Sequence, residues 1–265
     1  MNEKTLKISV VSYLNSRPFM LGLKKFDGQS KYRISQDIPS VCAEKLIKNE
    51  ADIGLIPVAM IASLPESHIV TSCCIAADGA VDSVVLVSHQ PLSEIHEVIL
   101  DTESRTSVML ARILAREWWH IQPKWVAQKA SDDFSDPLHT KAAVMIGDKA
   151  LRYKSLYPYC YDLAEEWKKF TGLPFVFAAW VSNKEISAED IRTLELAFKD
   201  GLNRRDELLL QLKEEYPGTD LRNYLYEKIR YHLGEKEWQG LRLFLSKCRQ
   251  DEYRSSGPVP SAEVK

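Results

Sequence analysis

The chain has 265 residues, 45% of them hydrophobic, and a formal net charge of −2. This length and composition are enough to bury a large core, as one α/β unit or as two lobes of roughly 100 residues each. The 35 lysines and arginines are scattered and form no basic stripe, so the charge pattern favours neither nucleic acid nor an acidic membrane surface as a partner.

Along the first two thirds of the chain, short apolar runs alternate with segments of helical period, a pattern typical of βα units around a largely parallel sheet. The predicted strands are residues 7–11, 52–56, 83–88, 97–100, 124–127, 142–146 and 175–180. Helices are predicted at residues 41–48 after a Ser40 cap, directly after Pro57, at 107–119, and at 163–170 between Asp162 and Gly172. Beyond Asn183, residues 187–216 and 221–248 are predicted to be almost wholly helical.

Two segments rich in small residues, 76–83 and 171–174, predict places where the chain crosses between two lobes. We expect one lobe to consist of residues 1–88 together with 178–265, and the other of residues 89–177. A cleft between the lobes is then the expected ligand site.

Cysteine usage and the N-terminal sequence bear on the compartment. The chain has five cysteines, an odd number without metal-type pairing, which favours a reducing compartment over a disulfide framework. Residues 1–7 do not resemble a signal peptide, and no stretch approaches the roughly 20 apolar residues of a membrane span. We therefore expect a cytoplasmic protein, and its oligomeric state stays open.

Motifs for metals and nucleotides are missing from the sequence. The six histidines include no H-E-x-x-H pair, and the chain has neither a P-loop nor a dinucleotide fingerprint. We therefore expect no metal and no cofactor, which leaves cofactor-free chemistry or binding alone.

The first predicted strand runs into the turn Asn15, Ser16, Arg17 and Pro18. Proline is tolerated at the first helical position, and Asn15 or Ser16 can cap the free amides beside it. Those amides, the positive end of the helix dipole and Arg17 would attract a carboxylate. The alternative interpretation is an ordinary strand-to-helix connection.

Two later strand ends share this character. Residues 97–100 lead to Thr106 and Ser107 at a helix start, where hydroxyls and amides can hold a carboxylate. Residues 142–146 lead to Gly147, which permits close backbone approach, and to Asp148, which is a better cap than catalyst. Ligands of open α/β sheets sit at the carboxyl ends of strands, so we expect these turns to surround one pocket.

Ser83 precedes a predicted crossover strand, so its hydroxyl is expected to face the same cleft. No G-x-S-x-G elbow surrounds it, which argues against a nucleophilic serine.

An ordered set of motifs resembles a known family. The motifs are SYLNSRP at 12–18, DIGLIP at 52–57, VDSV at 81–84, LD at 100–101 with SRTS at 104–107, IGD at 146–148, YDL at 161–163, and Trp167 with TGLPFVFA at 171–178. Together they resemble the chorismate dehydratases of the futalosine route to menaquinone. The resemblance spans residues 7–180, and the helical C-terminal third adds little to it.

The resemblance implies an α/β, two-lobed type II periplasmic-binding-protein-like fold with a ligand cleft between the lobes and a helical C-terminal segment. It implies an enzyme that removes water from chorismate to give 3-[(1-carboxyvinyl)oxy]benzoate. The departing hydroxyl and hydrogen lie on one face of the chorismate ring, so a small polar group or the substrate's own enolpyruvyl carboxylate can relay the proton. Amides that hold the ring carboxylate would stabilise the delocalised charge.

On this basis we assign roles to the candidate residues. Asn15 would orient the reacting hydroxyl or carboxylate, and Ser83 would hydrogen-bond near the leaving group. The substrate-binding candidates are Ser16, Arg17, Thr106, Ser107, Gly147 and Asp148. Arg17 either supplies a charge to the pocket or points to solvent.

Two alternatives stay open. A paralogous lyase of the same pathway forms 1,4-dihydroxy-6-naphthoate; its first loop typically contains Pro-Asn-Asp-Thr, unlike this chain, and His89 or His139 would be candidates for its general base. The fold also suits a solute-binding or sensing protein without activity.

Overall fold

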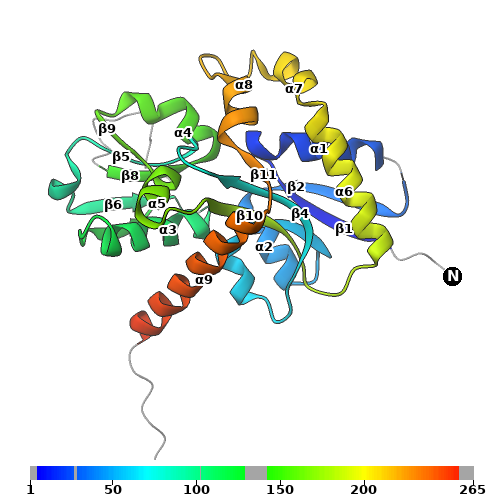
Figure 1. The fold of residues 1–265 in the computed structure, drawn as a ribbon, viewed down its shortest axis with the longest axis horizontal. Helices are drawn as coiled ribbons and strands as arrows, with labels where there is room; N and C mark the ends of the chain where they lie inside the picture. The colour runs from blue at the N-terminus through cyan, green and yellow to red at the C-terminus, as the bar shows by residue number, and fades with distance from the viewer. Residues whose placement is uncertain (1–4, 27–28, 102, 129–141, 257–265) are drawn as a thin grey trace, which may run out of the picture.

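The computed structural model describes residues 5–26, 29–101, 103–128 and 142–256, with side chains placed up to residue 249. Two β-sheets with helices packed around them form the body of the molecule. Helix α9 (Glu235–Ser256) packs against this body through the buried Leu241 and Phe244, and its C-terminal end projects from it (Figure 1). Within the described ranges, no helix is long and apolar enough to span a membrane.

The first sheet has the strand order β11-β4-β10-β3-β1-β2. Its strands are β1 (Leu6–Val11), β2 (Tyr32–Asp37), β3 (Ile53–Pro57), β4 (His68–Ala77), β10 (Phe175–Ser182) and β11 (Arg230–His232). The second sheet has the order β7-β6-β8-β5-β9. Its strands are β5 (Val84–Ser88), β6 (Glu97–Leu100), β7 (Lys124–Ala127), β8 (Ala142–Ile146) and β9 (Tyr159–Asp162).

Both sheets are mixed, so the prediction of a largely parallel sheet is wrong. In the first sheet, β1 is parallel to β2 and β3, but β10 is antiparallel to β3 and β4. In the second, β6 is parallel to β7 and β8, but β5 is antiparallel to β8 and β9. Strand β11 is likewise antiparallel to β4. Of the strands that run against their sheet, β5 and β10 are those that the chain enters directly from the other sheet. They start at the edge where β1, β3 and β8 end, so they run in the opposite direction.

The seven predicted strands all exist, and their bounds agree with the structure to within two residues. The prediction missed β2, β4, β9 and β11. Strand β2 is half exposed and alternates polar with apolar side chains, and β9 also has exposed residues. Strand β11 has only three residues and lies inside the stretch that was predicted to be helical.

Helix positions agree closely with the prediction, with one correction at a cap. The observed helices include α1 (Arg17–Leu23), α2 (Pro39–Ile47), α3 (Arg105–Glu117), α4 (Gly147–Tyr153), α5 (Leu163–Thr171), α6 (Ala188–Asn203), α7 (Arg205–Leu212) and α8 (Leu221–Asn223), with a 3₁₀ helix η3 (Val58–Ser63) after Pro57. Helix α2 starts at Pro39 rather than after a Ser40 cap, because proline suits the first helical turn. Gly172 ends α5 with a positive φ of 74°.

The chain crosses between the sheets twice, after β4 and before β10. Strand β5 therefore belongs to the second sheet, although the predicted division assigns residues 1–88 to the first lobe. Strand β10 begins at Phe175 in the first sheet, although that division assigns residues up to 177 to the second lobe. We retain two lobes as a proposal, with boundaries moved to the crossings at 78–83 and 172–174.

Helix α1 is held to the first sheet by a close crossing with α6. A Cβ atom added to Gly22 would lie 1.8 Å from the carbonyl oxygen of Ala197, and one added to Gly201 would lie 1.9 Å from that of Pro18. Only glycine allows two backbones to approach so closely. Beneath this crossing, Phe198 stacks on Trp180 with 4.3 Å between ring centroids. The start of α1, which carries the first predicted site turn, is thereby fixed on the sheet.

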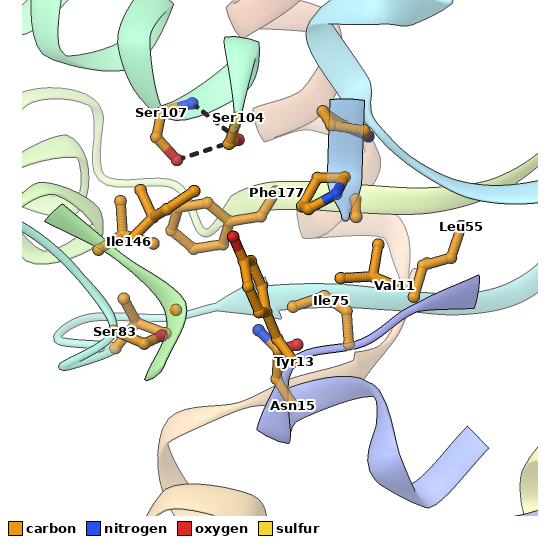
Figure 2. Close-up of a pocket in the computed structure, with 16 residues that line it drawn as sticks. Val11, Tyr13, Asn15, Leu55, Ile75, Ser83, Ser104, Ser107, Ile146 and Phe177 are labelled. Atoms are coloured by element: carbon orange, nitrogen blue, oxygen red, sulfur yellow. Dashed lines mark hydrogen bonds between the residues drawn. The ribbon is translucent and has the colours of Figure 1, made fainter. Parts of the chain in front are cut away.

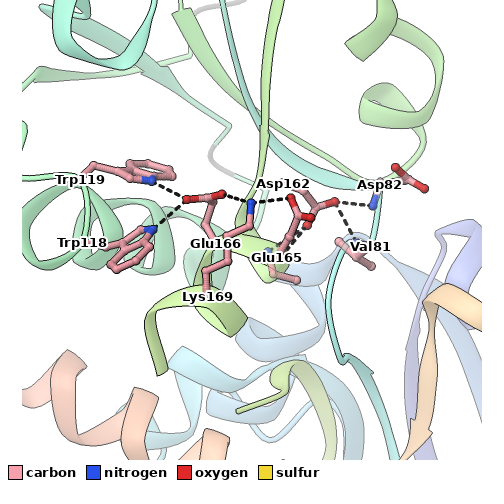
Figure 3. A network of polar contacts seen from close by, with 9 residues as sticks. Val81, Asp82, Trp118, Trp119, Asp162, Glu165, Glu166 and Lys169 are labelled. Atoms are coloured by element: carbon pink, nitrogen blue, oxygen red, sulfur yellow. Dashed lines mark hydrogen bonds and ion pairs between the residues drawn. The ribbon is translucent and has the colours of Figure 1, made fainter. Parts of the chain in front are cut away.

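The crossing into β5 is held by the carboxylate of Asp162 (Figure 3). One of its oxygens accepts the backbone N–H groups of Val81 and Asp82 at 2.8 and 2.6 Å, and the other caps α5 through the N–H groups of Ala164 and Glu165. One buried side chain thus ties the crossing to the second sheet and to α5.

Asp162 makes the stability of the protein depend on pH. Burial raises the pKa of its carboxyl from 3.8 to about 6. Between these values the folded state holds a proton that the unfolded state has lost, so the free energy of unfolding falls as the pH rises through this window. At about 1.4 kcal/mol per pKa unit, the Asp162 contribution amounts to roughly 3 kcal/mol at most.

We expect Asp162→Asn to remove this contribution. In urea unfolding from pH 4 to pH 7, the stability lost by the variant relative to the wild type should be larger at pH 4 than at pH 7. Asp78→Asn removes a carboxylate that pairs with Lys168 at the same crossing, and serves as the control. Parallel pH profiles for the wild type and Asp162→Asn would contradict the assignment.

Candidate active site

A cavity of about 50 Å³ lies between the two sheets, at the carboxyl ends of β1, β3 and β8 (Figure 2). Its walls are mostly apolar and include Val11, Leu55, Ile75, Ile146 and Phe177. Its polar side chains are Tyr13, Asn15, Ser83, Ser104 and Ser107. An apolar cavity with a few convergent polar groups is typical of small-molecule sites.

Asn15 lines the cavity from η1 (Leu14–Ser16), the 3₁₀ turn between β1 and α1. Neither Asn15 nor Ser16 caps α1 with its side chain, so the predicted cap is wrong. The reason is that the buried Ser16 hydroxyl donates to the backbone carbonyls of Val11 and Tyr13 instead. The backbone carbonyl of Asn15 accepts the Tyr231 hydroxyl at 3.0 Å, which fixes the turn from behind.

Ser83 and Gly147 meet on the opposite side of the cavity. The N–H of Gly147 donates to the backbone carbonyl of Ser83 at 2.7 Å, and Gly147 has a φ of 59°. A Cβ atom at Gly147 would lie 3.0 Å from the ring of Tyr13, so glycine is needed both for the backbone angle and for space. The Ser83 hydroxyl is buried and accepts the hydroxyl of Tyr224 at 2.9 Å.

The N-terminus of α3 forms a third part of the wall. The N-cap residue Ser104 accepts the N–H of Ser107 at 3.4 Å, and the two hydroxyls lie 3.3 Å apart at the cavity (Figure 2). The partial positive charge of a helix N-terminus, with these hydroxyls, suits a carboxylate. Ser104 was not selected from the sequence, although a serine three residues before Ser107 at a helix start is the signal of an N-cap.

Four predicted substrate-binding residues lie outside the cavity lining. Thr106 is turned away, and its hydroxyl accepts the N–H of Ala59 at 3.1 Å. The guanidinium of Arg17 forms an ion pair at the surface with the carboxylate of Glu215, with 3.3 Å between the nitrogen and the oxygen. Ser16 and Asp148 are the other two predicted residues outside the lining.

Asp148 connects the first turn to the C-terminal region. Its carboxylate accepts the N–H of Leu14 at 3.2 Å and the hydroxyl of Tyr216 at 2.8 Å. It therefore supports the wall of the cavity from outside and does not contact the interior.

Tyr13 stands inside the cavity. Its ring lies between Asn15 and the Ser104–Ser107 pair (Figure 2). Its hydroxyl donates to the carboxylate of Glu103 on the second-sheet side. Burial and the hydrogen bond to Glu103 raise the pKa of Tyr13 far above its usual value, so the group is a neutral phenol. The ring leaves a free volume well below the roughly 300–1,000 Å³ of usual ligand sites.

Among the described residues, no histidine lines this cavity. His89 is exposed and packs on Tyr157, and His139 lies outside the described residues. Among the residues placed by the structure, no three His, Cys, Asp or Glu side chains come together in a way that would hold a metal ion.

The chain matches the model of a protein family described as menaquinone biosynthesis over residues 6–250. It belongs to this family. The matched region includes every element that supplies a wall of the cavity, from β1 to β10.

Two relatives of this menaquinone-biosynthesis protein are named chorismate dehydratase. The one from Thermus thermophilus is 26% identical over an alignment of 260 residues, and the match covers 86% of this chain and 94% of the relative. The one from Campylobacter jejuni is 24% identical over 252 residues, which cover 90% and 96% of the two chains.

Solved structures confirm the fold. A protein from Archaeoglobus fulgidus superposes with a TM-score of 0.76 at 14% identity, covering 95% of this chain and 99% of its own. The periplasmic aliphatic sulphonate binding protein of Escherichia coli superposes with a TM-score of 0.60 at 14% identity, covering 94% and 93%. This member of the menaquinone-biosynthesis family therefore has the predicted α/β, periplasmic-binding-protein-like fold, with a helical C-terminal segment.

Proposed function

We propose that this protein is a chorismate dehydratase of menaquinone biosynthesis, which converts chorismate to 3-[(1-carboxyvinyl)oxy]benzoate and water. The observation that carries the proposal is the match to a chorismate dehydratase over 94% of that enzyme's length. The shape and chemistry of the cavity support it, as follows.

Chorismate is a dianion whose carboxylated cyclohexadiene ring also carries a hydroxyl and an enolpyruvyl ether. The N-terminus of α3, with Ser104 and Ser107, is the place we assign to the ring carboxylate, and Ile146 and Phe177 would pack against the ring. Entry of a molecule of this size requires the ring of Tyr13 to leave the cavity, which breaks its hydrogen bond to Glu103. Binding therefore includes a movement of the first turn or of the Tyr13 side chain.

The reaction breaks one C–H and one C–O bond on the same ring face and forms an aromatic ring. Negative charge that develops during proton loss spreads to the ring carboxylate, where the α3 amides stabilise it. Ser83 is assigned to donate a hydrogen bond to the departing oxygen. Asn15 is assigned to orient the hydroxyl or the enolpyruvyl carboxylate. That carboxylate can take the proton from the ring carbon and pass it to the departing hydroxyl, which leaves as water.

Incubation of the purified protein with chorismate, followed by chromatography, tests this function. We expect a new enolpyruvyl-oxybenzoate peak that grows with protein concentration and is absent with heat-denatured protein. Binding of chorismate without turnover would instead indicate a sensing protein. Turnover of cyclic dehypoxanthinyl futalosine, but not of chorismate, would identify the naphthoate-forming lyase.

We also propose that the enzyme serves the futalosine route and works in the cytoplasm. The family match and the five free cysteines support this, because free thiols persist in a reducing compartment. Deletion of the gene should then cause a menaquinone requirement that the enolpyruvyl-oxybenzoate product relieves. Fractionation of cells should recover the protein with cytoplasmic markers.

A further inference from the structure

Tyr224 occupies an unusual backbone segment behind the cavity. It is the first residue of the π-helix η6 (Tyr224–Lys228), which lies between α8 and β11. Single π-helical turns are rare and are found frequently at functional sites. Here the turn brings the Tyr224 side chain, which is only 3% exposed, against Ser83 from a position 141 residues later in the chain.

The direction of the hydrogen bond matters for chemistry. The Tyr224 hydroxyl donates to the Ser83 hydroxyl oxygen at 2.9 Å. A serine hydroxyl has one hydrogen and two acceptor positions, so accepting from Tyr224 leaves the Ser83 hydrogen available for another acceptor. Ser83 lines the cavity, so an acceptor that binds there can receive the Ser83 hydrogen. Tyr224 then donates to Ser83 while Ser83 donates to that acceptor, and each of the two hydrogen bonds strengthens the other.

The surroundings keep Tyr224 a neutral donor. Burial raises the pKa of its hydroxyl, and the nearby carboxylates of Asp148 and Asp82 act in the same direction. The net shift is upward, so the phenol keeps its proton. Tyr224 thus meets Ser83, one of the residues that we assign to the chemistry, as a protonated phenol.

We propose that Tyr224 is a positioning residue of the dehydratase, which holds the Ser83 hydroxyl as a hydrogen-bond donor to the departing oxygen. The inference rests on the proposed function. Tyr224 itself transfers no proton and does not touch the substrate. Its effect reaches the reaction through Ser83.

The test removes one oxygen atom. In Tyr224→Phe, kcat for chorismate should fall roughly 10- to 100-fold while KM changes by about twofold or less, because Ser83 loses its orientation but the carboxylate site at α3 is untouched. Tyr226→Phe is the matched control, since Tyr226 belongs to the same π-helix but its hydroxyl bonds Asp206 at the surface. This control should retain the wild-type kcat, and circular dichroism should show that both variants are folded.

A double variant separates positioning from a general structural role. In a Ser83→Ala background, Tyr224→Phe should lower kcat by about twofold or less, because the group through which it acts is already missing. Losses that multiply would overturn the inference, as would a wild-type kcat in Tyr224→Phe. A wild type that does not turn over chorismate would overturn the proposed function itself, and this inference with it.

Discussion

Ser83→Ala is expected to lower kcat for chorismate roughly 100-fold, since removing one preorganised donor at a site of developing charge has an effect of this size. The Ser83 hydroxyl is a polar group in a mostly apolar cavity, and the residue is only 1% exposed. The measurement is steady-state kinetics with product detection by chromatography.

Ser88→Ala is the matched control for this variant. Ser88 is equally buried and lies at the other end of the same strand, β5, away from the cavity. Its substitution should leave kcat unchanged, which separates the effect of the cavity from that of a lost buried serine.

Asn15→Ala should reduce kcat to a similar extent and also leave the fold intact. The contact that fixes this turn runs from Tyr231 to the backbone carbonyl of Asn15, and the substitution preserves it. Full turnover in both Asn15→Ala and Ser83→Ala would show that neither assignment is correct.

The second large effect is on stability. Gly201→Ala should lower the free energy of unfolding by roughly 2 kcal/mol or more, although alanine is the better helix former by about 1 kcal/mol. The added Cβ would lie 1.9 Å from the carbonyl oxygen of Pro18, while real Cβ contacts stay beyond 3.0 Å. Helices α1 and α6 must therefore move apart. The loss of packing between them lowers the stability by more than the higher helix propensity of alanine raises it.

Urea unfolding measures this change. Leu196→Ala, on the exposed side of the same helix, is the control and should change stability by less than about 0.5 kcal/mol. A Gly201→Ala variant as stable as the wild type would mean that the crossing can relax without cost. The variant should also lose kcat, because a shift of α1 displaces the turn that carries Asn15.

Much of the fold was predictable because its signals are local. Continuous apolar runs predicted β5, β6 and β8, and caps such as Asp162 predicted helix starts. Strand β4 was not predicted because it carries polar residues along its first half. Strand β11 was not predicted because three residues are too few to show a periodic pattern.

The sequence predicted which turns lie at the site, because this depends on the course of the backbone. It did not predict which side chains of those turns face the cavity. Adjacent helical residues point about 100° apart, so Ser107 faces the cavity and Thr106 faces Ala59. Arg17 pairs with a residue 198 positions away, and no local pattern reveals such a partner. The same holds for Tyr224, whose role depends on a contact made far along the chain.

The order of strands also sets the order in which a growing chain can assemble. Strands β5 to β9 occupy residues 84–162 without interruption, so the second sheet can form as soon as that stretch is synthesised. Among the described strands, β4 pairs with β10 and β11 alone, so its partners become available only when residues 175–182 and 230–232 have been synthesised. Non-local pairings of this kind slow folding. On the ribosome, the wall that carries Ser107 is therefore completed early, and the wall behind Asn15 is closed last.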